Sequence, residues 1–212
     1  MKKFSFAYKR LVNKLILKFC ISKINKKGEY LFLTFDDGPE PGITEFILNE
    51  LDKYNFKGTF FCTGKNAELH PELIQLILKR GHLIGNHSYS HKHAYLLNAK
   101  AYIEDINKAK EVIPSPIFRP PNGCLLFSAW LYLRKNFKII YWSIDSGDWR
   151  KESFNTNRSL SDLKRSKAGD IILFHFSQDL SKGTIKLLPI YLNWMHKNGY
   201  KSITLKEISK SH

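Results

Sequence analysis

The sequence has few cysteines and no apolar run that approaches the length of a membrane span. Its three cysteines, Cys20, Cys62 and Cys124, are odd in number, widely spaced and outside any metal-knuckle pattern. This arrangement argues against a disulfide framework and favours a reducing compartment. Together, the two absences predict a cytoplasmic protein without a transmembrane helix.

Acidic residues are missing from the first 28 positions, which carry nine of the 34 lysines and arginines. The chain of 212 residues has a formal net charge of +15, but the positions after residue 28 carry only 25 bases against 19 acids. The basicity is therefore concentrated in an N-terminal arm, residues 1–28. Since no groove-reading module is visible, we expect no nucleic-acid partner. Composition and length predict one globular domain over residues 29–212.

The arm is predicted to form a basic amphipathic helix. Asn13, Lys14 and Lys18 interrupt every candidate apolar core, so we expect no signal peptide. Two interpretations of the arm are open: its apolar stripe packs on the domain, or residues 1–22 lie peripherally on the inner face of an anionic membrane. The residues of that stripe are Tyr8, Leu11, Val12, Leu15, Ile16, Phe19 and Cys20.

Beyond the arm, short apolar runs alternate with amphipathic segments. This rhythm predicts parallel strands joined by crossover helices. The predicted strands are 31–36, 58–62, 82–86, 117–119, 138–144, 171–176 and 202–205. The predicted helices are 43–54, 71–80, 98–112, 128–135, 159–166 and 184–198.

Polar residues that suit a metal site lie at the ends of these predicted strands. The first strand ends in two adjacent carboxylates, Asp36 and Asp37, followed by Gly-Pro. Two acids side by side repel each other, so a fold rarely places them at a strand end without a function. His87 and His91 are four residues apart and would reach one ion from a helical turn. Two imidazoles and one carboxylate would form an open catalytic site with room for water.

Three further strand ends carry reactive groups. Arg119 precedes Pro-Pro-Asn-Gly and would present a guanidinium on a rigid turn. Asp145 and Asp148 precede Trp149, so this strand end would place two carboxylates beside an aromatic ring. His175 ends a buried strand, where a neighbouring carboxylate could hold its imidazole protonated.

Taken in order, five segments resemble the polysaccharide deacetylases, which form carbohydrate esterase family 4 and share the NodB homology domain. The resemblance covers about residues 30–205 and implies a distorted (β/α) barrel of about seven parallel strands with outer helices. It also implies one divalent metal ion, usually Zn²⁺ and sometimes Co²⁺ or another ion. The matching segments are Thr34-Phe-Asp-Asp-Gly-Pro39, His87-Ser-x-x-His91, Arg119-Pro-Pro-x-Gly123, Asp145-x-x-Asp148-Trp149 and Leu173-x-His175.

The resemblance also implies a role for each matching residue. The metal ligands would be Asp37, His87 and His91. Asp36 would be the general base that takes a proton from the attacking water, and Arg119 would hold it in place. His175 would be the general acid that protonates the departing amine, and it would pair with Asp148. Trp149 and Leu173 would wall the acetyl pocket, and Pro121 and Asn122 would contact the substrate.

One position departs from the family pattern, since relatives usually have Tyr where this chain has Asn122. The family's oxyanion donor is a backbone amide at this position, so we expect activity to survive the change. The expected function is hydrolysis of N-acetyl groups on N-acetylated amino sugars of a chitooligosaccharide, peptidoglycan-type or lipid-linked glycan. The alternative is a carbohydrate-binding protein of the same fold with weak catalysis. Every polar catalytic position is filled, which favours the enzyme.

Overall fold

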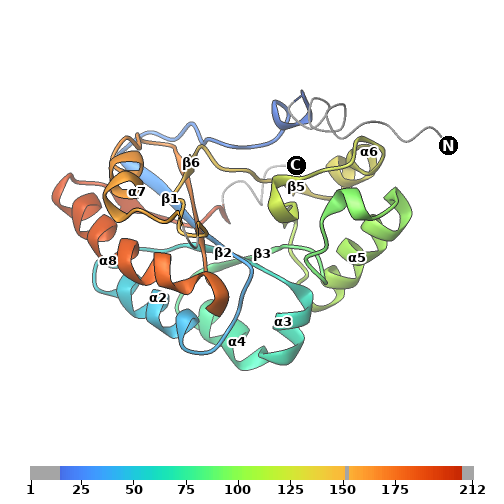
Figure 1. Ribbon diagram of the computed structural model, residues 1–212, viewed down its shortest axis with the longest axis horizontal. Coiled ribbons are helices and arrows are strands. Elements are labelled where there is room, and N and C mark those ends of the chain that lie inside the picture. The colour runs from blue at the N-terminus through green and yellow to red at the C-terminus, as the bar shows by residue number, and fades with distance from the viewer. Residues whose placement is uncertain (1–14, 151–152, 207–212) are drawn as a thin grey trace.

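A curled sheet of parallel strands positions the strand ends that the sequence singles out. The structure is a computed structural model that describes residues 15–150 and 153–206 (Figure 1). Its sheet has the order β5-β4-β3-β2-β1-β7-β6, and β8 pairs with the start of β1. The strands are β1 (Tyr30–Asp36), β2 (Thr59–Cys62), β3 (Leu83–Asn86), β4 (Ile117–Phe118), β5 (Lys138–Ile139), β6 (Ile144–Asp145), β7 (Ile171–His175) and β8 (Lys201–Ser202).

The predicted fold class, a distorted βα barrel of about seven parallel strands, is confirmed. Helices lie around the outside of the curled sheet (Figure 1). The helices are α2 (Ile43–Asp52), α3 (Gly64–Leu69), α4 (Pro71–Lys79), α5 (Ala99–Val112), α6 (Phe127–Asn136), α7 (Thr156–Leu163) and α8 (Ser181–Lys197). Short 3-10 turns form at η1 (Ala94–Leu96), η2 (Pro121–Gly123) and η3 (Gln178–Leu180).

Strand β1 lies in the middle of the sheet and is buried from Leu31 to Asp36. A strand covered on both faces needs a continuous apolar run, which explains the sequence Leu-Phe-Leu-Thr-Phe before the acids. In the β1–β7 register Asp36 lies opposite His175, and in the β1–β2 register it lies opposite Phe61. Two of the predicted functional residues are therefore brought side by side by strand pairing alone.

Several predicted boundaries are wrong, each for a local reason. The predicted strand 138–144 is two short strands, because the first part pairs with β4 and the second part pairs with β7 on the other side of the sheet. Helix α7 begins at Thr156 rather than at residue 159, because the Asn155 side chain caps it by accepting from the Arg158 N–H. Helix α3 was not predicted, and it begins where the Thr63 side chain accepts from the Asn66 N–H.

The described part of the arm packs only partly on the barrel. Ile16 is buried against α6, whereas Leu15 is 52% exposed and Phe19 is 74% exposed. Further along, Lys23 forms an antiparallel bridge with Asp170, just before β7. Tyr8, Leu11 and Val12 of the predicted stripe lie outside the described residues. None of the helices in the described ranges is long and apolar enough to cross a membrane.

Candidate active site

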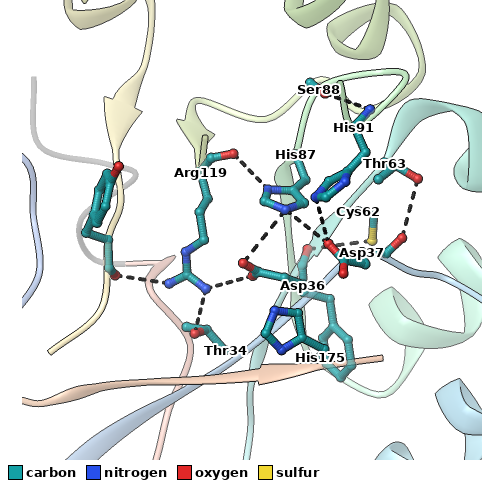
Figure 2. Close-up of polar contacts among 12 residues, drawn as sticks. Thr34, Asp36, Asp37, Cys62, Thr63, His87, Ser88, His91, Arg119 and His175 are labelled. Atoms are coloured by element: carbon teal, nitrogen blue, oxygen red, sulfur yellow. Dashed lines mark hydrogen bonds and ion pairs between the residues drawn. The ribbon is translucent and has the colours of Figure 1, made fainter. Parts of the chain in front are cut away.

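The carboxyl ends of the strands surround a cavity of about 340 Å³. Parallel sheets gather their functional groups at this end, and the sequence-predicted residues converge here from β1, β3, β4 and β7 and the loops after them (Figure 2). The cavity is lined by Asp36, Asp37, His87, His91, Asn122, Gly123, Trp142, Asp145, Trp149, Leu173, His175 and Leu180.

Three of these side chains point to a common centre. Asp37 Oδ1 lies 3.3 Å from His87 Nε2 and 3.0 Å from His91 Nε2. The three ligand atoms lie within 4.8 Å of one another, and this is the one group of three or more His, Cys, Asp or Glu residues found in the described ranges that could hold a metal. One carboxylate and two imidazoles suit Zn²⁺ and related divalent ions.

The two imidazoles come from a loop, which corrects the predicted helical turn. Ser88 and His91 both have positive φ, at 62° and 55°, so residues 87–91 cannot continue as a right-handed helix. The loop is held by side chains: Asn86 Oδ1 accepts from the Ser88 N–H at 2.8 Å, and Ser88 Oγ accepts from the His91 N–H at 3.1 Å. The i, i+4 spacing is correct for convergence, but the geometry that achieves it is a tight turn.

The surroundings of Asp37, His87 and His91 also suit a bound cation. His87 Nδ1 lies 2.8 Å from the Arg119 carbonyl oxygen, so Nδ1 carries the proton and the Nε2 lone pair faces the other ligands. Burial raises the pKa of Asp37, but the imidazoles of His87 and His91 beside it outweigh burial and hold the pKa well below its usual value. An ionised carboxylate and an imidazole with a fixed tautomer are what a metal requires of its ligands.

Asp36 is held by an arginine that is itself fully buried. Arg119 Nη1 donates to Asp36 Oδ1 at 2.7 Å and lies 2.8 Å from Thr34 Oγ1, while its Nη2 donates to the Tyr141 carbonyl at 3.0 Å. The guanidinium also lies 4.2 Å from the centre of the Phe61 ring. Arg119 is therefore fully enclosed just after β4, and its guanidinium contacts Asp36.

His175 and Asp148 form a second charged pair, in which the Asp148 side chain is fully buried and the His175 side chain is 13% exposed. His175 Nδ1 lies 2.8 Å from Asp148 Oδ1, and the His175 backbone N–H donates to Asp148 Oδ2 at 2.7 Å. Burial lowers the pKa of His175, but the neighbouring Asp148 carboxylate outweighs it and raises the pKa to about 9. The imidazole is therefore protonated at neutral pH and can donate a proton.

Two groups that contact this pair were missed by sequence reasoning. The fully buried Thr184 hydroxyl lies 2.6 Å from Asp148 Oδ2 and 2.8 Å from the His175 carbonyl oxygen. At Gly183 an added Cβ would lie 2.3 Å from the Asp148 carbonyl oxygen. In the sequence, Gly183 and Thr184 are only a small residue followed by a hydroxyl residue in the first turn of a helix. This pattern is too common to identify them as functional.

The predicted substrate residues occupy the rim and walls. Trp149 is 44% exposed, and its indole Nε1–H lies 3.2 Å from Asp145, while Leu173 is buried beneath the cavity. Asn122 lines the cavity with a φ of 56°, a left-handed conformation that Asn tolerates well. Pro121 is buried and is not among the lining residues. Trp142 and Leu180 line the cavity and were not predicted to do so.

Comparison with known proteins relates this geometry to one family. A family profile described as "Polysaccharide deacetylase" matches residues 23–137. A peptidoglycan-N-acetylglucosamine deacetylase of Bacillus cereus is 35% identical over 181 residues, which cover 82% of this chain. The crystal structure of the Bc1960 peptidoglycan N-acetylglucosamine deacetylase superimposes with a TM-score of 0.83 at 29% identity, covering 94% of this chain and 97% of that one.

A relative with a different named substrate also matches. The peptidoglycan-N-acetylmuramic acid deacetylase PdaC of Bacillus subtilis is 28% identical over 195 residues, which cover 88% of this chain. The chain spans only 40% of the length of PdaC, and 66% of the length of the Bacillus cereus relative.

Proposed function

Because the chain belongs to the polysaccharide deacetylase family, we propose that it hydrolyses N-acetyl groups from an N-acetylated amino sugar within a glycan. The observation that carries this proposal is the grouping of Asp37, His87 and His91 around one centre, in a cavity that Asp36 and His175 also line. Asp36 beside Arg119 suits a base, and His175 beside Asp148 suits an acid. Amide hydrolysis needs both functions in one cavity.

Asp37, His87 and His91 are the proposed ligands of one divalent ion, and Zn²⁺ is our proposed occupant. When bound, such an ion supplies Lewis acidity, which polarises an amide carbonyl and makes water more acidic at neutral pH. The ligands reach the centre from the end of β1 and the loop after β3, so the packed sheet sets their separation. Little reorganisation is then needed on binding.

Asp36 accepts the proton of the attacking water in the proposed mechanism. Its other carboxylate oxygen is fixed by Arg119, so the free oxygen has one defined direction. His175 then donates its Nε2 proton to the amine nitrogen as the carbon–nitrogen bond breaks, because an amine anion is too poor a leaving group to depart unprotonated. Trp149 and Leu173 shape the space for the acetyl methyl, and the backbone N–H of Asn122 is the proposed donor to the carbonyl oxygen.

The test is release of acetate and free amine after reconstitution with Zn²⁺ or Co²⁺. Suitable substrates are chitooligosaccharides, peptidoglycan, poly-N-acetylglucosamine and acetylated xylan, because the sugar is the least constrained part of the proposal. The Asp36→Asn variant is the matched control, since it keeps the shape of the base and removes its charge. A parent protein no faster than Asp36→Asn would favour a carbohydrate-binding role over the enzyme.

Asn122 makes the substrate preference a separate question. The Asn122→Tyr variant restores the ring that the family usually carries at this rim position. Comparable activity in the two forms would support a native enzyme with a wider rim. A gain of orders of magnitude in Asn122→Tyr would indicate that the natural chain is adapted to another substrate or impaired.

Peripheral membrane contact through residues 1–22 and a cytoplasmic location also stay proposals. The exposed Leu15 and Phe19 beside the basic Lys18 support the first, since apolar and basic side chains together suit an anionic lipid surface. Flotation with anionic vesicles, with and without residues 1–22, tests the contact. Equal partitioning of the two forms would exclude it. Cell fractionation tests the location.

A further inference from the structure

The first turn of α8 contacts the pair formed by His175 and Asp148. Thr184 is fully buried there, with its hydroxyl 2.6 Å from Asp148 Oδ2 and 2.8 Å from the His175 carbonyl oxygen. The preceding residue, Gly183, has no room for a side chain, because a Cβ would lie 2.3 Å from the Asp148 carbonyl oxygen. The close approach that glycine permits is what brings the Thr184 hydroxyl within hydrogen-bond distance.

A count of donors shows what the hydroxyl contributes. The Asp148 side chain is 0% exposed, so protein donors must satisfy its charge. Oδ1 accepts from His175 Nδ1 at 2.8 Å, and Oδ2 accepts from the His175 backbone N–H at 2.7 Å. Thr184 supplies the remaining contact to Oδ2, and it is the shortest of the three. Hydrogen bonds to a carboxylate are the stronger kind, so this donor fixes the plane of the carboxylate and with it the ring of His175.

We propose that Thr184 is a positioning residue for proton donation by His175, acting through the Asp148 carboxylate. The inference rests on the proposed function, in which His175 protonates the leaving amine. Thr184 touches Asp148 and the His175 backbone, and it is absent from the residues that line the cavity. It lies outside the five segments that carry the family resemblance, so the motifs do not assign it this role.

A positioning role differs from a purely structural one in its dependence on the leaving group. An amine must receive the His175 proton as its bond to carbon breaks, whereas p-nitrophenol leaves an acetyl ester as a stable phenolate without protonation. Misplacing His175 should therefore slow deacetylation of an N-acetyl sugar and spare hydrolysis of p-nitrophenyl acetate. General damage to the fold would slow both reactions.

The experiment compares Thr184→Val, Thr184→Ser and the parent on both substrates, with the Zn²⁺-loaded full chain. Valine keeps the shape of threonine and removes the donor, and serine keeps the donor. Thr59→Val is the matched control, because Thr59 is also fully buried and its hydroxyl is used in a hydrogen bond, to the Leu205 N–H at 3.0 Å, at the start of β2. We expect kcat for the N-acetyl sugar to fall about 10-fold in Thr184→Val, a part of the roughly 100- to 10,000-fold that a general acid provides.

The inference is supported if Thr184→Val slows only the amide reaction, with Thr184→Ser and Thr59→Val close to the parent. Equal slowing of both reactions, or of neither, overturns it. A second measurement is independent of turnover: the proton between His175 Nδ1 and Asp148 should give a downfield NMR resonance that Thr184→Val shifts or broadens and Thr59→Val does not. An unchanged resonance overturns the inference. If the parent lacks amide activity, the proposed function fails, and the NMR result still decides whether Thr184 orders the pair.

Discussion

Breaking the buried pair between Arg119 and Asp36 should cost the protein a large part of its stability. In Arg119→Met the apolar volume is roughly kept, but Asp36, whose side chain is only 5% exposed, loses its 2.7 Å partner. An ion pair broken in the interior leaves one uncompensated charge, at a cost of about 3–5 kcal/mol. The contacts to Thr34 and the Tyr141 carbonyl are lost as well, which places the expectation at the upper end of that range.

Urea unfolding of the chelated protein measures this cost without a contribution from bound metal. With a slope of about 2–3 kcal/mol per molar urea, a loss of about 5 kcal/mol moves the midpoint down by about 1.7–2.5 M. Arg119→Lys is an informative control, since an ammonium can pair with Asp36 but cannot span three acceptors as the guanidinium does. It should fall between the parent and Arg119→Met.

The double variant Asp36→Leu/Arg119→Met separates the lost pair from lost packing. Removing both charges leaves no unpaired ion, so the double variant should be more stable than Arg119→Met alone. A midpoint for Arg119→Met within error of the parent would refute the reasoning. So would a double variant whose loss equals the sum of the two single losses, because the two charges would then not be coupled.

Three further predictions concern the acid, the metal and the packing of α8. Because Asp148 raises the pKa of His175 to about 9, the proton donor is lost above that pH, so kcat/KM should fall as pH rises through about 9; in Asp148→Asn the fall should move to lower pH, and a fall centred at the same pH in both proteins would contradict it. Chelation should abolish deacetylation. Zn²⁺ at 100 times the dissociation constant of the parent should raise the unfolding free energy of the parent by about 2.7 kcal/mol. An equal gain in His91→Ala at the same Zn²⁺ concentration would exclude His91 as a ligand. Gly183→Ala should lower both Tm and kcat, because its Cβ would lie 2.3 Å from the Asp148 carbonyl oxygen; a Tm unchanged in a thermal melt would mean that α8 can move away freely.

The parts of the structure that follow from local sequence patterns could be predicted. The apolar run before Asp36 identifies a buried central strand, and alternating strands and helices identify a parallel sheet. Since chemistry gathers at the carboxyl ends of such strands, residues as distant as Asp37 and His91 could be expected in one cavity. Asp37 Oδ1 lies 3.0 Å from His91 Nε2, which agrees with that expectation.

The parts that depend on tertiary pairing could not be predicted. Nothing near Ile140 indicates that it forms a bridge with Ile21, more than 100 positions earlier in the chain. The spacing of His87 and His91 fits both a helical turn and the observed loop, and only the positive φ at Ser88 and His91 separates them. Thr184 sits in an ordinary amphipathic helix, and its role depends on a helix–loop contact that no sequence period reveals.

Arg119 contacts both the proposed base, Asp36, and the proposed metal ligand His87, through different atoms. Its guanidinium holds Asp36 at 2.7 Å, and its carbonyl oxygen accepts from His87 Nδ1 at 2.8 Å. Its own backbone N–H donates to the Asn86 carbonyl, one residue before His87, so the end of β3 and the end of β4 are fixed to each other. A side-chain substitution at Arg119 removes the support of the base but leaves the carbonyl that sets the His87 tautomer. The proposed base and the proposed metal site are therefore positioned by one residue and yet can be perturbed separately.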